Sequence, residues 1–282
     1  MKTLNPTDMK ERGKAIVVGW DFSEYSKLAL DHALFYAYQT TMKVCLVHIV
    51  RWQSDLAKME IELQKEVDQI YQKTGKRVDM MLRVGSVSSG LKAAAREISA
   101  AVVFIGTQGV KGIQNYVGSH VLKTIANSVI PFVVVQAPLE KHHKFTLVCP
   151  IDSRKECKEV LYWVTYLARI FGANISLVYP EYATPTKKIK TRANINFSKN
   201  YLRDYRMIYE EVKLDSKGFN KAIIKYAKDK HADLILTITN RRQKVQNFFF
   251  TDKIQYLLAN KEKIPVLCVS PRKDVWLYGG YK

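Results

Sequence analysis

Long hydrophobic runs and closely spaced cysteines are both missing from this sequence. No apolar run reaches about 18 residues, the length that a helix needs to cross a bilayer, so we expect no membrane span. Residues 1–8 hold no apolar segment of the kind that forms a secretory signal. The four cysteines have neither CxxC nor zinc-site spacing and are expected to be small buried hydrophobic residues. These absences predict a protein of the reducing cytoplasm.

Acidic residues are scarce relative to basic ones. The 282 residues carry a net charge of +19, and 47% of them are hydrophobic. This is the balance of a soluble globular chain that is long enough for two domains. Lys and Arg outnumber Asp and Glu by 17 to 12 in residues 1–138 but by 28 to 14 in residues 139–282. The densest basic runs, 187–192 and 240–244, have no stacking aromatics within them, so a solvated basic surface is favoured over a nucleic-acid site.

Apolar runs alternate with amphipathic segments through residues 14–136. The strands expected from these runs span residues 14–20, 44–50, 77–84, 101–105 and 132–136. The helices expected between them span residues 23–40, 54–74, 91–99 and 117–129, with a loop at 85–90. Near-continuous apolar strands in a β-α-β order predict a parallel sheet covered by helices on both faces. In such a sheet, ligands bind beyond the carboxyl ends of the strands, where the strand order reverses.

The same order recurs in the second half of the chain. Four segments within residues 145–269 echo four segments within residues 15–135 at a spacing of about 130 residues. A repeat of this length is a domain duplication rather than a solenoid. We therefore expect an α/β protein of two tandem doubly wound domains, residues 1–138 and 139–282, each with a five-stranded parallel sheet.

Four glycines follow the strand expected at residues 101–105: Gly106, Gly109, Gly112 and Gly118. Glycine tolerates positive φ and lets the backbone approach a ligand closely. A strand, a glycine-rich loop and a helix N-terminus together present N–H groups to a phosphate. The loop has neither the Gly-Lys-Ser/Thr ending of a Walker loop nor Gly-x-Gly-x-x-Gly spacing. A tight strand-to-helix connection would need the same glycines, so the motif alone leaves both readings open.

The loop resembles the Gly-x2-Gly-x9-Gly-Ser/Thr signature of ATP-binding universal stress proteins. Gly106 and Gly109 match the first pair, and Gly118 with Ser119 matches the end, although eight residues rather than nine separate Gly109 from Gly118. The resemblance covers nearly the whole chain and is stronger over residues 14–138. It implies an adenine nucleotide alpha hydrolase-like fold whose first domain binds ATP, with or without Mg²⁺.

The resemblance also assigns roles to single residues. Asp21, after the first strand, matches the nucleotide-contacting Asp of the family, although it could instead cap the following helix. Ile49 matches the apolar residue that packs on the adenine, and Trp20 would stack near the adenine or narrow the pocket. The expected ATP site comprises Gly19, Trp20, Asp21, Ile49, Gly85, Gly106, Thr107, Gly109, Gly118, Ser119 and His120.

The second half lacks the glycine loop. Residues 239–250 stand in its place without a glycine, so bulky side chains would block a nucleotide there. Residues 248–250, all phenylalanine, are expected at a domain or subunit interface or in an ordinary core. No nucleophile stands beside a base, and neither His48 nor His120 has a carboxylate partner by spacing. Slow hydrolysis of bound ATP is therefore the most activity that we expect.

The leading hypothesis is a cytoplasmic universal stress protein of the tandem type. It would bind an adenine nucleotide as a regulatory ligand that changes a surface seen by an unidentified protein partner. One alternative is an interaction scaffold that binds no nucleotide. Another is a nucleic-acid-binding protein that uses its basic second half. The two domains would pack as an internal pseudo-dimer, and a homodimer of the chain is equally compatible with the sequence.

Overall fold

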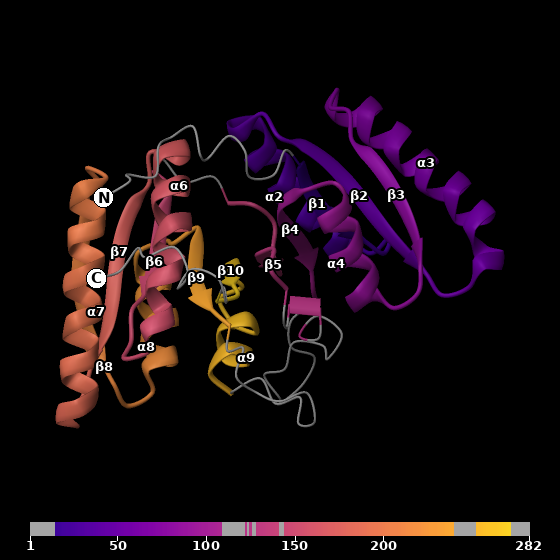
Figure 1. Cartoon of the computed structure of the whole chain (residues 1–282). Helices are drawn as coiled ribbons and strands as arrows, with labels where there is room; N and C mark the ends of the chain where they lie inside the picture. Colours follow the sequence, from indigo (N-terminus) through magenta and orange to yellow (C-terminus); the bar gives the residue numbers. More distant parts are fainter. Residues whose placement is uncertain are drawn as a thin grey trace.

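A computed structural model describes residues 15–108, 122, 124, 125, 128–140, 144–239 and 252–271 (Figure 1). The strands form one ten-stranded sheet in the order β3-β2-β1-β4-β5-β10-β9-β6-β7-β8. The first half of the chain contributes β1 (Ala15–Trp20), β2 (Lys43–Val50), β3 (Asp79–Val84), β4 (Ala100–Gly106) and β5 (Phe132–Val135). The second half contributes β6 (Thr146–Pro150), β7 (Asn174–Glu181), β8 (Tyr209–Asp215), β9 (Leu234–Ile238) and β10 (Val266–Val269).

Helices cover both faces of the sheet. The first half has α2 (Glu24–Thr40), a 3-10 turn η1 (Gln53–Asp55), α3 (Leu56–Thr74) and α4 (Val87–Glu97). The second half has a 3-10 segment η2 (Lys155–Val160), α6 (Leu161–Phe171), α7 (Pro185–Asp204), α8 (Phe219–Asp229) and α9 (Asp252–Leu258). Helices α2, α3, α6 and α7 contribute to the core on one face, and α4, α8 and α9 contribute to the core on the other.

Burial on both faces explains why the strands are near-continuous apolar runs. In β1, Ile16 and Val18 join the core beneath α2, while Val17 joins the core beneath α4. Successive side chains of a strand point to opposite faces, so a strand that is covered on both faces needs apolar residues at every position. Pairing within each half is parallel. The expected fold of two tandem five-stranded parallel sheets is confirmed.

The two halves join through β5 and β10, which form the only antiparallel pair among the described strands. Val133 lies opposite Leu267 at the centre of this seam. Aromatic residues of both halves also stack at this seam. Phe145 stacks on Phe171 with ring centroids 4.4 Å apart, and Phe171 stacks on Phe35 of α2 at 5.3 Å. The halves thus pack as pseudo-symmetric partners that share one hydrophobic core on the α2 and α6 face.

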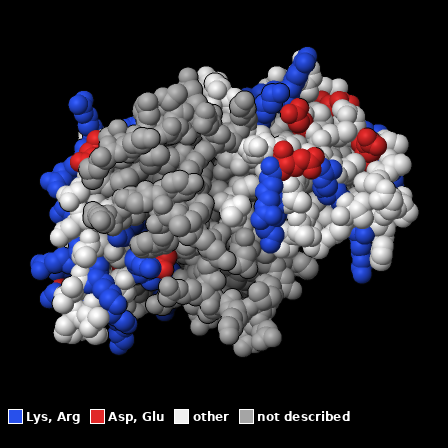
Figure 2. Space-filling model, in the orientation of Figure 1, with Lys and Arg blue, Asp and Glu red and all other residues white. Residues whose placement is uncertain are grey.

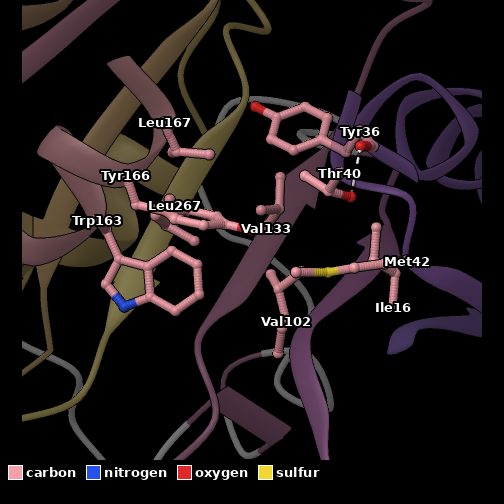
Figure 3. A pocket seen from close by; sticks show the side chains of 11 residues that line it. Ile16, Tyr36, Thr40, Met42, Val102, Val133, Trp163, Tyr166, Leu167 and Leu267 are labelled. Atoms are coloured by element: carbon pink, nitrogen blue, oxygen red, sulfur yellow. Dashed lines mark hydrogen bonds between the residues drawn. The ribbon is translucent and has the colours of Figure 1, made fainter. Parts of the chain in front are cut away.

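A small cavity lies in this seam (Figure 3). Tyr36 of α2 lines it from the first half, and Trp163 and Tyr166 of α6 line it from the second. The cavity encloses about 20 Å³ and exposes no polar atoms, so it has room for about one water but offers that water no hydrogen-bonding partner. It is too small and too apolar to be the functional site.

Helix α4 begins at Val87 rather than at the predicted Leu91. Ser86 caps this helix, since Ser86 Oγ accepts a hydrogen bond from Ser89 N at 3.2 Å. A run of serine and glycine is typical of a loop, but a capping serine satisfies an otherwise unpaired amide of the first helical turn. The prediction of a loop through residue 90 is wrong for this reason. Gly90 lies inside α4, where a Cβ would approach Ile49 Cδ1 to 2.6 Å.

Candidate functional site

The strand order of the first half reverses between β1 and β4. The chain leaves β1 through α2 and returns as β2 on one side of β1, whereas β4 pairs on the other side. In doubly wound sheets, this is the place where ligands bind, beyond the carboxyl ends of the two strands. Asp21 follows β1 directly, Gly106 is the last residue of β4, and Thr107 comes next. The fold thus brings these predicted site residues to one edge of the sheet.

Asp21 is exposed and is held by its neighbour Ser23. Asp21 Oδ1 accepts hydrogen bonds from Ser23 N at 3.1 Å and from Ser23 Oγ at 2.5 Å. Ser23 Oγ in turn accepts from Ser26 N at 3.2 Å, so Ser23 and not Asp21 is the N-cap of α2. Within the described part of the chain, no donor reaches Asp21 Oδ2. The carboxylate therefore faces the edge of the sheet with one oxygen available.

Trp20 is buried in the core on the α2 face, with 3% of its surface exposed, and does not present its ring to the edge of the sheet. Its indole Nε1 has no hydrogen-bond partner among the described residues. His48 Nδ1 donates to the Trp20 carbonyl oxygen at 2.8 Å, which ties the end of β2 to the end of β1. Phe22, in the left-handed conformation at φ +62°, lies with its ring centroid 4.9 Å from that of His48. His48 is therefore a positioning group for the turn after β1.

Gly106 is required by packing, whatever else it does. A Cβ at this position would collide with the carbonyl group of Tyr25, in the first turn of α2. Only glycine lets the end of β4 pass this close to the start of α2. The Thr107 N–H is also occupied, because it donates to the Val135 carbonyl oxygen at 2.9 Å. At these two positions, the tight strand-to-helix connection considered for the loop is present.

The remaining predicted residues divide into two groups. A Cβ at Gly19 would lie 2.9 Å from Ile105 Cγ2 of β4 and 3.3 Å from Leu91 Cδ1 of α4. Ile49 is half-buried against Gly90, and Gly85 follows β3 in open space. Other parts of the predicted site and interface lie outside the described residues: Gly109, Gly118, Ser119, His120 and residues 248–250.

In the second half, the chain itself fills the equivalent edge. Asp152 Oδ1 accepts from Arg154 N at 2.8 Å, and Asp152 Oδ2 accepts from Arg154 Nε at 2.8 Å. Asn194 of α7 donates to the carbonyl oxygens of Asp152 and Arg154 at 2.7 and 2.9 Å. Burial, and then the nearby Asp152 charge, raise the pKa of the Cys157 thiol to about 12, so this residue stays neutral beside the loop. The Asp152 carboxylate is paired where Asp21 is not.

Sequence reasoning missed Arg154 and Asn194. Arg154 had a visible signal, since Asp21-Phe-Ser23 in the first half corresponds to Asp152-Ser-Arg154 in the second. Asn194 had none, because its partners lie about 40 residues earlier in the chain and only the packing of α7 brings them together.

Comparison with known proteins assigns a family to the first half of the chain. The model of the universal stress protein family matches residues 13–136, the segment that holds β1 to β5 and the glycine loop. The first half of this chain belongs to the universal stress protein family. Within this universal stress protein domain, Asp21 and Gly106 stand on either side of the strand-order reversal. The matched range ends at residue 136, so for the second half the likeness is one of fold.

Solved structures resemble the whole chain. A universal stress protein of Archaeoglobus fulgidus DSM 4304 is 12% identical, has a TM-score of 0.75, and covers 92% of this chain and 99% of its own. A Pseudomonas aeruginosa UCBPP-PA14 protein assigned to the same family is 14% identical, has a TM-score of 0.65, and covers 94% of this chain and 95% of its own. At these identities, the shared property is the tandem fold. A search of curated proteins found no match.

Two further findings concern membrane-spanning helices and metal-binding groups among the described residues. None of their helices combines the length and the apolar character that crossing a membrane requires. Nor do these residues contain a group of three or more His, Cys, Asp or Glu side chains that could hold a metal ion.

Proposed function

We propose that the universal stress protein domain binds an adenine nucleotide, ATP first of all, as a regulatory ligand in a cytoplasmic stress response. One observation carries the proposal. Asp21 presents an exposed carboxylate where the strand order reverses, and only one of its two oxygens is engaged by the described residues. This is the position from which the fold recognises ligands.

The roles of the residues follow from their places at this edge. Asp21 Oδ2 would accept a hydrogen bond from a ribose hydroxyl, and Ile49 at the end of β2 would offer apolar surface to the base. The phosphates would lie against the N–H groups of the loop from Gly109 to Ser119. These contacts stay predictions, because the loop lies outside the described residues. Mg²⁺ would accompany those phosphates. The Thr107 N–H takes no part, because Val135 already accepts from it.

We propose one nucleotide per chain. At the equivalent edge of the second half, the Arg154 side chain occupies both oxygens of Asp152. Asn194 holds the two carbonyl groups that frame this turn. A nucleotide would have to displace a charge-assisted pair and two hydrogen bonds before making any contact of its own.

A scaffold that binds no nucleotide is the second candidate, and two observations favour it. Gly106 is explained by its contact with Tyr25, and the Thr107 N–H is explained by its bond to β5. Two positions of the matched signature therefore have structural reasons that need no ligand.

Calorimetric titration of the full chain with Mg-ATP tests the proposal. We expect one site, with affinity reduced at least about tenfold by Asp21→Ala, since a hydrogen bond to a charged group contributes about 1.5–3 kcal/mol. The matched control is Asp152→Ala, which removes the corresponding carboxylate and should leave the affinity unchanged. A thermal shift provides an independent readout, because ligand at 100 times its Kd should add about 2.7 kcal/mol of stability.

Three results would count against the proposal. Two nucleotides per chain would refute the proposal that Arg154 and Asn194 close the edge of the second half. An affinity that falls with Asp152→Ala but not with Asp21→Ala would place the site in the second half. No binding and no thermal shift would favour the scaffold.

A further inference from the structure

Helix α7 begins with six residues that nothing in the described structure covers. Residues 185–190 are all exposed, and Ile189 is 68% exposed. Burial starts at Thr191 and continues on the same face of the helix through Ser198 to Leu202. Lys187 lies one turn before Thr191 on that face, yet it is exposed. The first turns of α7 therefore project beyond the body of the second half.

This projecting segment is strongly cationic. Lys187, Lys188, Lys190 and Arg192 fall within six residues, and no Asp or Glu occurs between Glu181 and Asp204. Among the described residues, none of these four cations makes an ion pair. Among the charged side chains along the left of Figure 2, the side on which Figure 1 places α7, blue predominates, whereas blue and red are mixed on the right.

The position of these charges works against helix stability. The N-terminus of a helix carries partial positive charge, so acidic residues stabilise its first turn and cations destabilise it. Helix α2 follows this preference with Glu24, whereas α7 has no acidic residue in its first turn and no side-chain cap. Lys187 Nζ lies 5.4 Å from the centre of the Tyr182 ring, a contact that leaves its charge in place. Cations that neither stabilise the helix nor join a described ion pair are available for an external anion.

The exposed face of α7 continues this chemistry along the rest of the helix. It carries Arg192, Asn196, Asn200 and Arg203 at helical spacing. Arginine and asparagine donate hydrogen bonds to phosphates and to base edges. Ile195 and Leu202 are buried in the core, and the exposed Ile189 does not by itself form an apolar face with which α7 could enter a membrane surface.

We propose that the exposed surface of α7, made of its first turns with Lys187, Lys188 and Lys190 and of the face from Arg192 to Arg203, is a binding surface for the phosphate backbone of nucleic acid. A helix of 20 residues is about 30 Å long and can follow several consecutive phosphates. The sequence favoured a solvated basic surface because its two basic runs are separate and lack aromatics. Folding changes that assessment by placing the first run on one projecting, acid-free helix. This inference does not depend on the nucleotide site.

Fluorescence anisotropy with a labelled oligouridine of about 20 nucleotides tests the surface on the full chain. We expect binding at low salt, with a slope of log K against log salt of about −3 from four phosphate contacts. Replacing Lys187, Lys188, Lys190 and Arg192 together by Gln should weaken binding at least about tenfold and remove most of that slope. Circular dichroism checks that α7 still folds.

The matched control removes four positive charges elsewhere in the same half. Lys217, Lys221, Lys225 and Lys261 are exposed, and the last three line a groove between α8 and the residues after α9. Their replacement by Gln should change the affinity less than about threefold. An equal loss in both variants would show diffuse attraction by net charge, and a loss in the control alone would move the surface to α8. Either result overturns the proposal, as does binding to anionic lipid vesicles without binding to the oligonucleotide.

Discussion

The two halves of this chain have the same strand order, but the residues that follow their first strands make different contacts. After β1, a neutral serine caps α2 and leaves the Asp21 carboxylate exposed. After β6, an arginine pairs with the Asp152 carboxylate, and the helix on this side of the sheet starts only after the 3-10 segment η2. Burial of the strands requires the same apolar pattern in both halves, whereas residues beyond the strand ends contribute little to the core. A duplicated domain can therefore keep its sheet and change its site.

The end of β4 shows how one residue follows from this difference. Gly106 contacts the backbone of α2 so closely that no Cβ fits. The corresponding position at the end of β9 holds Ile238, which is buried in the core of the second half. The residue after each strand makes an equivalent hydrogen bond. The Thr107 N–H donates to the carbonyl oxygen of the last residue of β5, and the Thr239 N–H donates to that of the last residue of β10. The glycine of the first half is thus tied to the close approach of α2.

The largest effect that we expect comes from Gly106→Ala. The added methyl would collide with the Tyr25 carbonyl group, so α2 or β4 must shift, and unfolding free energy should fall by more than about 4 kcal/mol. Urea denaturation measures the loss. Gly75→Ala is the control, because Gly75 has φ +67° but open space around it and should cost only about 1 kcal/mol. Similar losses in the two variants would refute the contact between α2 and β4.

Smaller losses of unfolding free energy are expected from changes in the two turns that follow β1 and β6. Ser23→Ala removes the N-cap of α2 and should cost about 1 kcal/mol. Arg154→Ser, which copies the first-half residue into the second, breaks a partly exposed ion pair and should cost less than about 1 kcal/mol. Arg154→Ser should also leave nucleotide stoichiometry unchanged, because Asn194 still holds the turn. A second bound nucleotide in this variant would show that Arg154 alone closes that edge.

The last effect is a pH dependence of stability that belongs to the first half. His32 of α2 is 4% exposed, its Nε2 donates to the Ala137 carbonyl oxygen at 3.2 Å, and burial lowers its pKa below 6.5. Below pH 6.5, the unfolded chain therefore binds a proton that the folded chain does not, and stability falls as the pH falls. The slope from one such group is at most about 1.4 kcal/mol per pH unit.

Unfolding measured between about pH 7.5 and about pH 5.5 checks this effect, with those limits chosen about one unit on either side of the ordinary histidine pKa. His32→Gln keeps a donor for the Ala137 carbonyl and should flatten the dependence. At the repeat spacing of about 130 residues, the second half has Trp163 in this place. An unchanged slope in His32→Gln would show that other groups carry the acid sensitivity.

Most of the fold could be predicted from the sequence, and part of the candidate site could be. Residues Ala15–Trp20 and Phe132–Val135 are almost entirely apolar, a pattern that a doubly covered strand demands. The place of Asp21 at a strand end followed from the same pattern. The start of α4 did not, because the Ser86 cap looks like loop composition. The direction of Trp20 did not follow either, since a strand residue can face either side until the helices are in place.

The sequence by itself determined the strands, the duplication and the loss of the glycine loop in the second copy, because these depend on local pattern and spacing. Only the tertiary structure decided that β5 pairs antiparallel with β10, that Gly106 meets Tyr25, and that Asn194 closes the edge beside Asp152. It also decided that the first basic run lies in the exposed first turns of α7. These contacts join residues far apart in the chain, and their energies depend on shape and burial that exist only after packing.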